Sequence, residues 1–137
     1  MHTYDTMNYD KKIVASAAIL AAGAIGLGAF GAHGLSDVIS PKALSSFETG
    51  VRYQMYHALA LLIIGSTISI SINTRRWVYL FFISGVFLFS GSIYFLSLRE
   101  IWPFSVAILG PITPIGGLLL ILGWLRLLYG IVKVKNG

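Results

Sequence analysis

The sequence contains no cysteine, and only 11% of its 137 residues are Asp, Glu, Lys or Arg. The missing cysteines exclude disulfides, thiolate metal sites and cysteine nucleophiles. A soluble domain carries about 25% charged residues, so this chain has too little polar surface to face water. The net charge of +5 does not indicate a nucleic-acid partner, because the basic residues cluster at the ends of apolar segments, where they meet anionic lipid headgroups.

Four long segments contain no charged residue and make up most of the chain: 13–32, 53–74, 77–98 and 101–125. A helix of about 20 residues crosses the ~30 Å hydrocarbon core of a bilayer. The pattern predicts an all-α integral membrane protein, a single bundle of four transmembrane helices at about 13–32, 53–73, 77–98 and 112–131. The first segment exceeds the ~7–15 residues of a signal-peptide core, so we expect a retained helix.

The distribution of basic residues predicts the orientation of these spans. Lys and Arg are enriched in cytoplasmic loops. If the N-terminus is inside, seven basic residues fall on the cytoplasmic side and three on the outer side, so both termini are expected in the cytoplasm. The inner set is Lys11, Lys12, Arg75, Arg76, Arg126, Lys133 and Lys135, and the outer set is Lys42, Arg52 and Arg99.

The last apolar segment is interrupted by prolines. Between residues 101 and 132 the only charge is Arg126, and a straight helix of that length would reach ~48 Å, well beyond the hydrocarbon core. Prolines remove backbone donors and bend a helix. We therefore expect a short helix over 101–109 and a break packed against the outer ends of spans one and two, ahead of the fourth span. The residues of this break are Gly110, Pro111, Thr113 and Pro114.

The second span begins within a polar stretch. Residues 58–72 would reach only ~22 Å, so the span must also use residues from 53 onward, which places Gln54 and His57 in the outer part of the bilayer. Ser40 followed by Pro41 is typical of a helix start. The outer connection 33–52 is therefore expected to contain a short amphipathic helix that runs into the second span, with Glu48 and Arg52 close enough to pair on it.

Five polar residues at this outer end are candidates for a functional site: His33, Glu48, Arg52, Gln54 and His57. One interpretation is an outward-facing vestibule that binds or relays a solute. The interpretation that we favour is structural: Gln54 and His57 hydrogen-bond across helices, so His57 matters more for stability than for activity. His33 can instead cap the first helix, with Gly34 in a left-handed conformation. The spacing forms no metal-ligand motif, so neither a metal nor a cofactor is predicted.

Small residues recur at helical spacing on three of the spans. Such stripes let helices approach closely in lipid, where hydrophobicity gives no drive for association. Packing within the chain is the simpler interpretation, and an oligomer interface is the alternative. The residues are Ala18, Ala22 and Gly26 on span one, Ser84 and Gly91 on span three, and Gly116, Gly123 and Gly130 on span four.

Three motifs occur in a fixed order along the chain: GAFGAHGL at 28–35, YQMYHALA at 53–60 and LGPITPIGG at 109–117. Together they resemble the YgdD-like proteins, a bacterial inner-membrane family of unknown function with small animal transmembrane relatives. The resemblance implies a four-helix protein of the bacterial inner membrane. It implies no activity.

No catalytic motif is found in the sequence. A Gly-rich phosphate loop, a nucleophile elbow and a metalloprotease helix are all missing, and no span contains a carboxylate that could couple export to an ion gradient. We therefore expect a non-enzymatic membrane protein that packs among lipids with itself or with another membrane protein. A transporter or channel with the polar vestibule is the alternative, since broken helices often line substrate sites. An enzyme acting on lipid is a third possibility.

Overall fold

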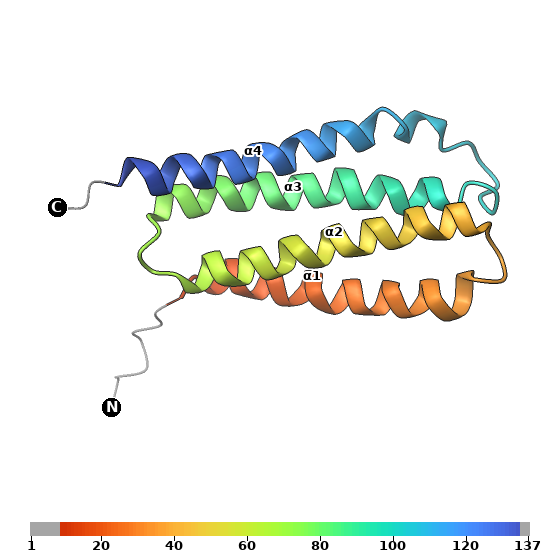
Figure 1. Cartoon of the computed structure of the whole chain (residues 1–137), viewed down its shortest axis with the longest axis horizontal. Helices are drawn as coiled ribbons and strands as arrows, with labels where there is room; N and C mark the ends of the chain where they lie inside the picture. The colour runs from red at the N-terminus through yellow and green to blue at the C-terminus, as the bar shows by residue number, and fades with distance from the viewer. Residues whose placement is uncertain (1–8, 135–137) are drawn as a thin grey trace.

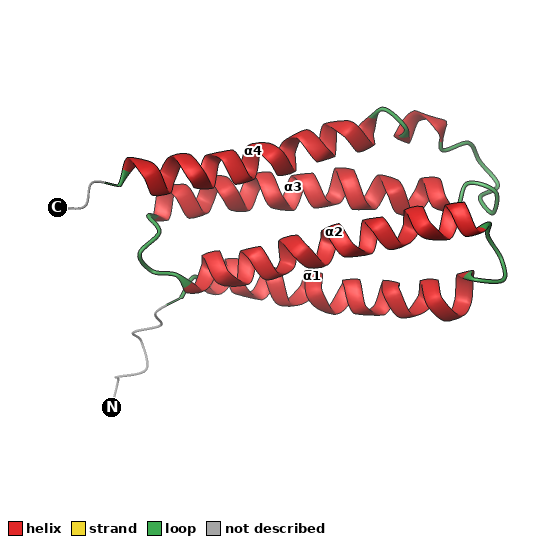
Figure 2. Ribbon diagram, viewed as in Figure 1, coloured by secondary structure: helices red, strands yellow, loops and turns green. Residues whose placement is uncertain are grey.

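The computed structural model of the protein describes residues 9–134. Four long helices run back and forth along one axis, as Figures 1 and 2 show. They are α1 (Lys11–Phe30), α2 (Pro41–Ser66), α3 (Ile72–Ser97) and α4 (Ile112–Lys133), with a π-helical turn at Gly31–Leu35 and a 3-10 turn at Ala107–Leu109.

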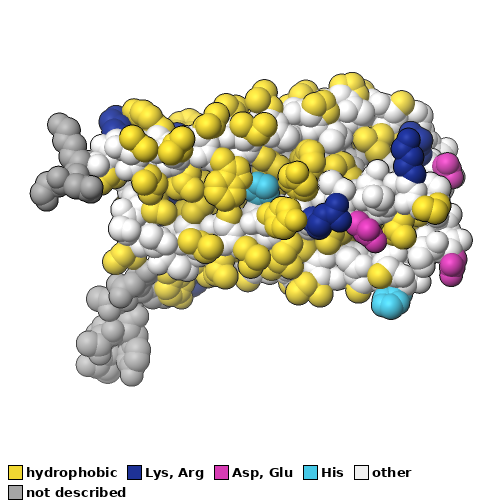
Figure 3. Space-filling view, in the orientation of Figure 1, with side chains coloured by type: hydrophobic (Ala, Val, Ile, Leu, Met, Phe, Trp, Pro, Cys, Tyr) yellow, Lys and Arg dark blue, Asp and Glu magenta, His cyan; other side chains and the backbone are white. Residues whose placement is uncertain are grey.

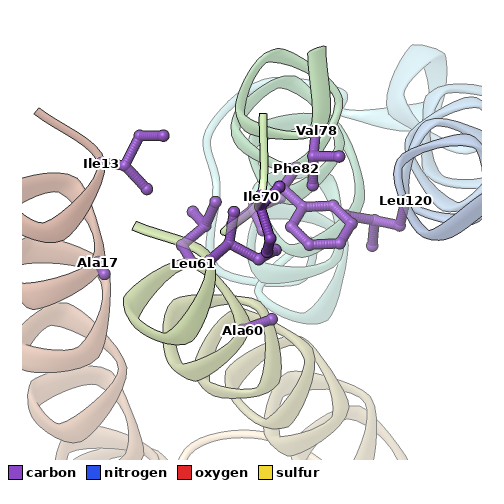
Figure 4. Packing of buried hydrophobic residues seen from close by; sticks show 10 residues of the cluster. Ile13, Ala17, Ala60, Leu61, Ile70, Val78, Phe82 and Leu120 are labelled. Carbon is purple, nitrogen blue, oxygen red and sulfur yellow. The ribbon is translucent and has the colours of Figure 1, made fainter. Parts of the chain in front are cut away.

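Each helix packs mainly on its neighbours along the chain, and the contact between α3 and α4 is the most extensive. Figure 4 shows the arrangement from close by, with α1 and α4 on opposite sides of the α2–α3 pair. The bundle is thus flattened, and α2 and α3 lie at its centre. The main core comes from all four helices and the α2–α3 loop (Figure 4), and it consists of Ile13, Ala17, Ala60, Leu61, Ile64, Ile70, Val78, Phe82, Val86 and Leu120.

Many hydrophobic side chains are exposed on the face of the bundle that Figure 3 shows. Three helical stretches are long and apolar enough to cross a membrane: Lys11–Leu35, Ile72–Ser97 and Ala107–Lys133. Helix α2 lies beside α1 and α3 but is less apolar, because its first half carries Lys42, Glu48 and Arg52.

Helix α2 runs without a break from the outer connection into the segment predicted as the second span, as the sequence indicated. It starts at Ser40, whose side chain accepts a hydrogen bond from the Ala43 amide at 3.2 Å, and Pro41 occupies the first turn, where its missing N–H is not needed. Its 26 residues make a rod of ~39 Å. The predicted outer helix and the predicted second span therefore form one continuous helix.

The turn between α2 and α3 lies earlier than expected. The second span was expected to reach residue 73 and the turn to follow at 73–76, whereas α2 ends at Ser66 and α3 begins at Ile72. Hydroxyl side chains cause the shift, because they offer the backbone local partners that compete with the helix. Thr67 donates to the Ile63 carbonyl at 2.6 Å, and Ser71 accepts from the Thr74 amide at 3.2 Å as the cap of α3.

The expected short helix over 101–109 is reduced to the single turn at Ala107–Leu109. Pro103 disfavours helical backbone at the residue before it. The indole of that residue, Trp102, donates to the Phe95 carbonyl at 2.9 Å and stacks on the Phe95 ring. The chain is thereby folded back onto the end of α3 instead of continuing as a helix.

Helix α1 also ends differently from the expectation. No glycine with positive φ occurs among residues 9–134, so Gly34 does not form a left-handed cap. The helix instead widens into the π-helical turn Gly31–Leu35, which places the exposed His33 beyond the end of α1.

Candidate functional site

Glycines of α4 form a close contact with α3. Gly116 and Gly123 are buried. A Cβ atom on Gly116 would collide with the backbone of Phe89, and one on Gly123 would come within 2.5 Å of the Phe82 ring. A Cβ on Gly130 would collide with Thr74. These three glycines therefore set how closely the two helices approach.

On α3 the residue that meets α4 is Gly85, where a Cβ would lie 2.6 Å from Leu120. Sequence reasoning missed it and selected Ser84 and Gly91 instead. The Ser84 hydroxyl is exposed and donates to the Leu80 carbonyl at 2.6 Å, and a Cβ on Gly91 would have no atom within 4 Å. The close-packed row of α3 thus lies one residue away from the predicted one.

The small-residue stripe of α1 faces outward. Ala18, Ala22 and Gly26 are exposed, and a Cβ on Gly26 would meet nothing within 4 Å. The residues of α1 that face the rest of the chain include Ala17 and Ala24, both buried. Because α1 is apolar on every side, its sequence carries no signal for which face is buried.

Gln54 joins three helices. Its side chain is only 7% exposed. The amide nitrogen donates to the Leu20 carbonyl of α1 at 2.8 Å, and the amide oxygen accepts from the Tyr94 hydroxyl of α3 at 2.7 Å. Gly23 makes room for this amide, since a Cβ there would lie 3.1 Å from the nitrogen.

His57 joins α2 to α4 and is 4% exposed. The Trp124 indole donates to Nε2 at 3.1 Å, and Nδ1 lies 2.7 Å from the Tyr53 carbonyl. An indole N–H can only donate, so Nε2 accepts and Nδ1 carries the proton. Both nitrogens of a neutral ring are therefore used within the bundle.

The other three candidates lie on the surface and do not join Gln54 and His57. His33, Glu48 and Arg52 are exposed. The Arg52 guanidinium donates to the Thr49 hydroxyl at 3.0 Å. The five residues thus do not converge on one vestibule. Within residues 9–134, no group of three His, Cys, Asp or Glu side chains is placed to hold a metal ion.

The helix break was expected against the outer ends of the first two spans, but it lies at the start of α4 and bonds to the end of α3. Pro111 is the N-cap of α4, and Pro114 lies in the first turn, where helices tolerate proline. The Thr113 hydroxyl bonds to that of Ser92 at 2.6 Å and reaches the Leu109 carbonyl at 3.5 Å.

A cavity of about 510 Å³ lies at the same end, between the start of α2, the end of α3 and the start of α4. Gly110, Thr113 and Pro114 line it on the α4 side. Spacing in the sequence could not have revealed this cavity, because one of its walls, the start of α2, lies far along the chain from the other two.

Replacing His57 by alanine is expected to lower the melting temperature in detergent modestly. The Trp124 N–H loses its partner, and cross-helix hydrogen bonds in membranes average ~0.6 kcal/mol. The loss of the edge-on packing between the His57 and Phe82 rings adds to this. Trp124→Phe removes the same bond with less loss of volume and should give a smaller shift. An unchanged melting temperature together with abolished solute flux would contradict the structural role of His57 and favour transport.

Comparison with known proteins supports the conclusion that this is a membrane protein. The family model "Protein of unknown function (DUF423)" matches residues 27–117. A UPF0382 membrane protein of Staphylococcus epidermidis is 50% identical over 113 residues, covering 80% of this chain and 86% of that protein.

Two further relatives come from other bacteria. UPF0382 membrane protein YwdK of Bacillus subtilis is 43% identical over 129 residues, covering 90% of this chain and 98% of that protein. A UPF0382 membrane protein of Haemophilus influenzae is 39% identical over 116 residues, covering 82% of this chain and 86% of that protein. No solved structure matches. The chain therefore belongs to the DUF423 family of membrane proteins of unknown function.

Proposed function

We propose that the protein is a non-enzymatic protein of the bacterial inner membrane that assembles with a second copy of itself. In this proposal all four helices cross the bilayer and both termini lie in the cytoplasm. The antiparallel packing of α2 between its neighbours supports its crossing, and the excess of basic residues at one end supports the orientation. The resemblance to the YgdD-like proteins and their animal relatives fits the same description.

The observation that carries the proposal is a charged pair on the exposed side of α2. Figure 3 shows a basic and an acidic side chain among hydrophobic ones over this helix. Glu48 and Arg52 are both exposed and lie one turn apart. Within α2, Arg52 bonds to the neutral Thr49 hydroxyl, and a carboxylate from outside the helix would add a stronger, charge-assisted bond.

The depth of Arg52 makes its exposure unfavourable in lipid. Phe47 lies beside Gly31, since a Cβ on Gly31 would be 3.1 Å from its ring. Gly31 is near the end of the uncharged stretch 13–32, so Arg52 lies about 7 Å deeper than the edge of the apolar layer. An arginine in lipid costs up to about 3 kcal/mol at the bilayer centre and is relieved in part by extending toward the headgroups.

A two-fold dimer would satisfy both charges. In a two-fold interface, residue i of one copy meets residue j of the other and the reverse. Arg52 of each copy would then pair with Glu48 of the other. The exposed rings of Tyr53 and Tyr56, 39% and 55% accessible, flank the pair and are typical of interface centres.

Cross-linking tests this interface directly, because the chain has no cysteine of its own. Ser45→Cys introduces a thiol on the same exposed side of α2, and Val38→Cys places a control thiol at the same end but off that face. We expect oxidation in membranes to form dimers with Ser45→Cys and far fewer with Val38→Cys. Arg52→Glu should reduce the yield by opposing two acids, and adding Glu48→Arg should restore it.

Equal yields for both thiols, or an Arg52→Glu variant that cross-links like its parent, would sink the proposed interface. Stronger cross-linking from Ala18→Cys would show that the interface is instead the small-residue face of α1.

The Ser45→Cys variant also reports the orientation of the protein in the membrane. A membrane-impermeant maleimide added to intact cells labels it only if this end faces outward.

A further inference from the structure

The cavity at the α3–α4 end carries charge of both signs. Lys42 on α2 and Arg99 after α3 line it, together with Glu100. Figure 3 shows basic and acidic side chains at this end of the molecule, where α3 ends and α4 begins. Two cations and one carboxylate leave a net charge of +1, which a single anion would balance.

A buried hydroxyl in the cavity wall has no protein partner. Ser97 lines the cavity and is 6% exposed. Its Oγ atom makes no hydrogen bond to any of the described residues. A buried polar group without a partner is unfavourable, because it has given up its hydrogen bonds to water. The Ser97 hydroxyl is therefore available to bond a polar group of a ligand in the cavity.

The position of the cavity points to the membrane surface. Trp102 stacks between Phe95 and Phe104 in the loop that closes this end, with ring centroids 5.4 and 5.7 Å apart. Tryptophan and other aromatic rings gather at the level of the lipid headgroups. Ile93 and Leu96 form an apolar wall of the cavity, along which an acyl chain can leave toward the bilayer interior.

We propose that this cavity binds the phosphodiester headgroup of an anionic glycerophospholipid. The phosphate lies between Lys42 and Arg99, which neutralise it. Headgroup hydroxyls donate to the Glu100 carboxylate and exchange hydrogen bonds with Ser97. The site stands independently of the α2 interface, since it uses a different set of residues.

Binding can be measured on purified, delipidated full-length protein in detergent. Phosphatidylglycerol and phosphatidylcholine are added in parallel, and retained lipid is counted by native mass spectrometry while the melting temperature is recorded. Inorganic phosphate and glycerol phosphate form a second arm that separates the lipid from the free ion. We expect phosphatidylglycerol to bind and stabilise more than phosphatidylcholine, and the two soluble phosphates to give little shift.

Three variants identify the site. Lys42→Gln and Arg99→Gln should each weaken phosphatidylglycerol binding about fivefold, the effect of one basic side chain near a membrane surface. Arg76→Gln, at the opposite end of the bundle, is the control and should bind normally. Ser97→Ala should weaken binding without lowering the melting temperature of the lipid-free protein, because it removes a hydroxyl that no protein group uses.

Normal binding by the double variant Lys42→Gln/Arg99→Gln would overturn the site. Equal binding of phosphatidylcholine would overturn the preference for an anionic headgroup. Stabilisation by inorganic phosphate equal to that by phosphatidylglycerol would show that the free ion, and not the lipid, is the ligand.

Discussion

Replacing Gly116 with leucine is expected to separate α4 from α3 and to give the largest loss of stability of any single substitution proposed for this protein. Even a Cβ atom at this position would collide with the backbone of Phe89. Overpacking against side chains costs about 1–3 kcal/mol because they can rotate away. A helix backbone must move as a unit, so we expect a loss of about 3 kcal/mol or more.

The measurement is thermal unfolding in detergent, followed by the fluorescence of the three tryptophans. Gly26→Leu is the matched control, because a Cβ atom at Gly26 would meet nothing within 4 Å. It places the same leucine on the outside of α1 and should leave the melting temperature close to that of the parent. If Gly116→Leu unfolds at the same temperature as Gly26→Leu, the close approach of α3 and α4 is not required for stability.

Replacing Gln54 with leucine is expected to give the next largest effect. The Tyr94 hydroxyl would lose its acceptor at 2.7 Å, and α1 would lose the bond to the Leu20 carbonyl. A buried hydroxyl without a partner is unfavourable by about 1–3 kcal/mol, whereas an apolar pair of similar shape is nearly neutral. The change should therefore destabilise the protein more than the volume difference alone explains.

A double-mutant cycle with Tyr94→Phe tests this explanation. We expect Gln54→Leu to cost less in the Tyr94→Phe background than in the parent, because no hydroxyl is then left unpaired. Additive losses in the two single variants would show that the bond between Gln54 and Tyr94 contributes no stability.

The long uncharged runs predicted the helical class, because runs of that length occur where the surroundings are lipid. The ends of the helices were less predictable from the positions of charged residues. The charges of Arg75 and Arg76 predict a turn there, but both residues lie within the first turns of α3. The turn itself is set by hydroxyl side chains at Thr67 and Ser71, which charge patterning cannot detect.

The sequence likewise predicts only part of the candidate site. Gln54 and His57 could be selected from the sequence as polar groups within an apolar span, but their partners, Tyr94 and Trp124, carry no sequence signal of their own. The buried face of α1 could not be selected at all, because apolar residues surround that helix. The cavity near Ser97 depends on the shape of three helix ends, which only tertiary packing determines.

The packing of each helix on its neighbour in sequence has a consequence for how the protein reaches the membrane. Nearly all contacts between helices join consecutive elements, so each hairpin can form as soon as its second helix has been synthesised, and local contacts favour rapid folding. Early pairing with the preceding helix matters most for α2, because it is the least apolar of the four helices. In the four-span arrangement that we propose, α2 enters the bilayer alongside α1, with Gln54 already bonded to the Leu20 carbonyl, before α3 emerges from the ribosome.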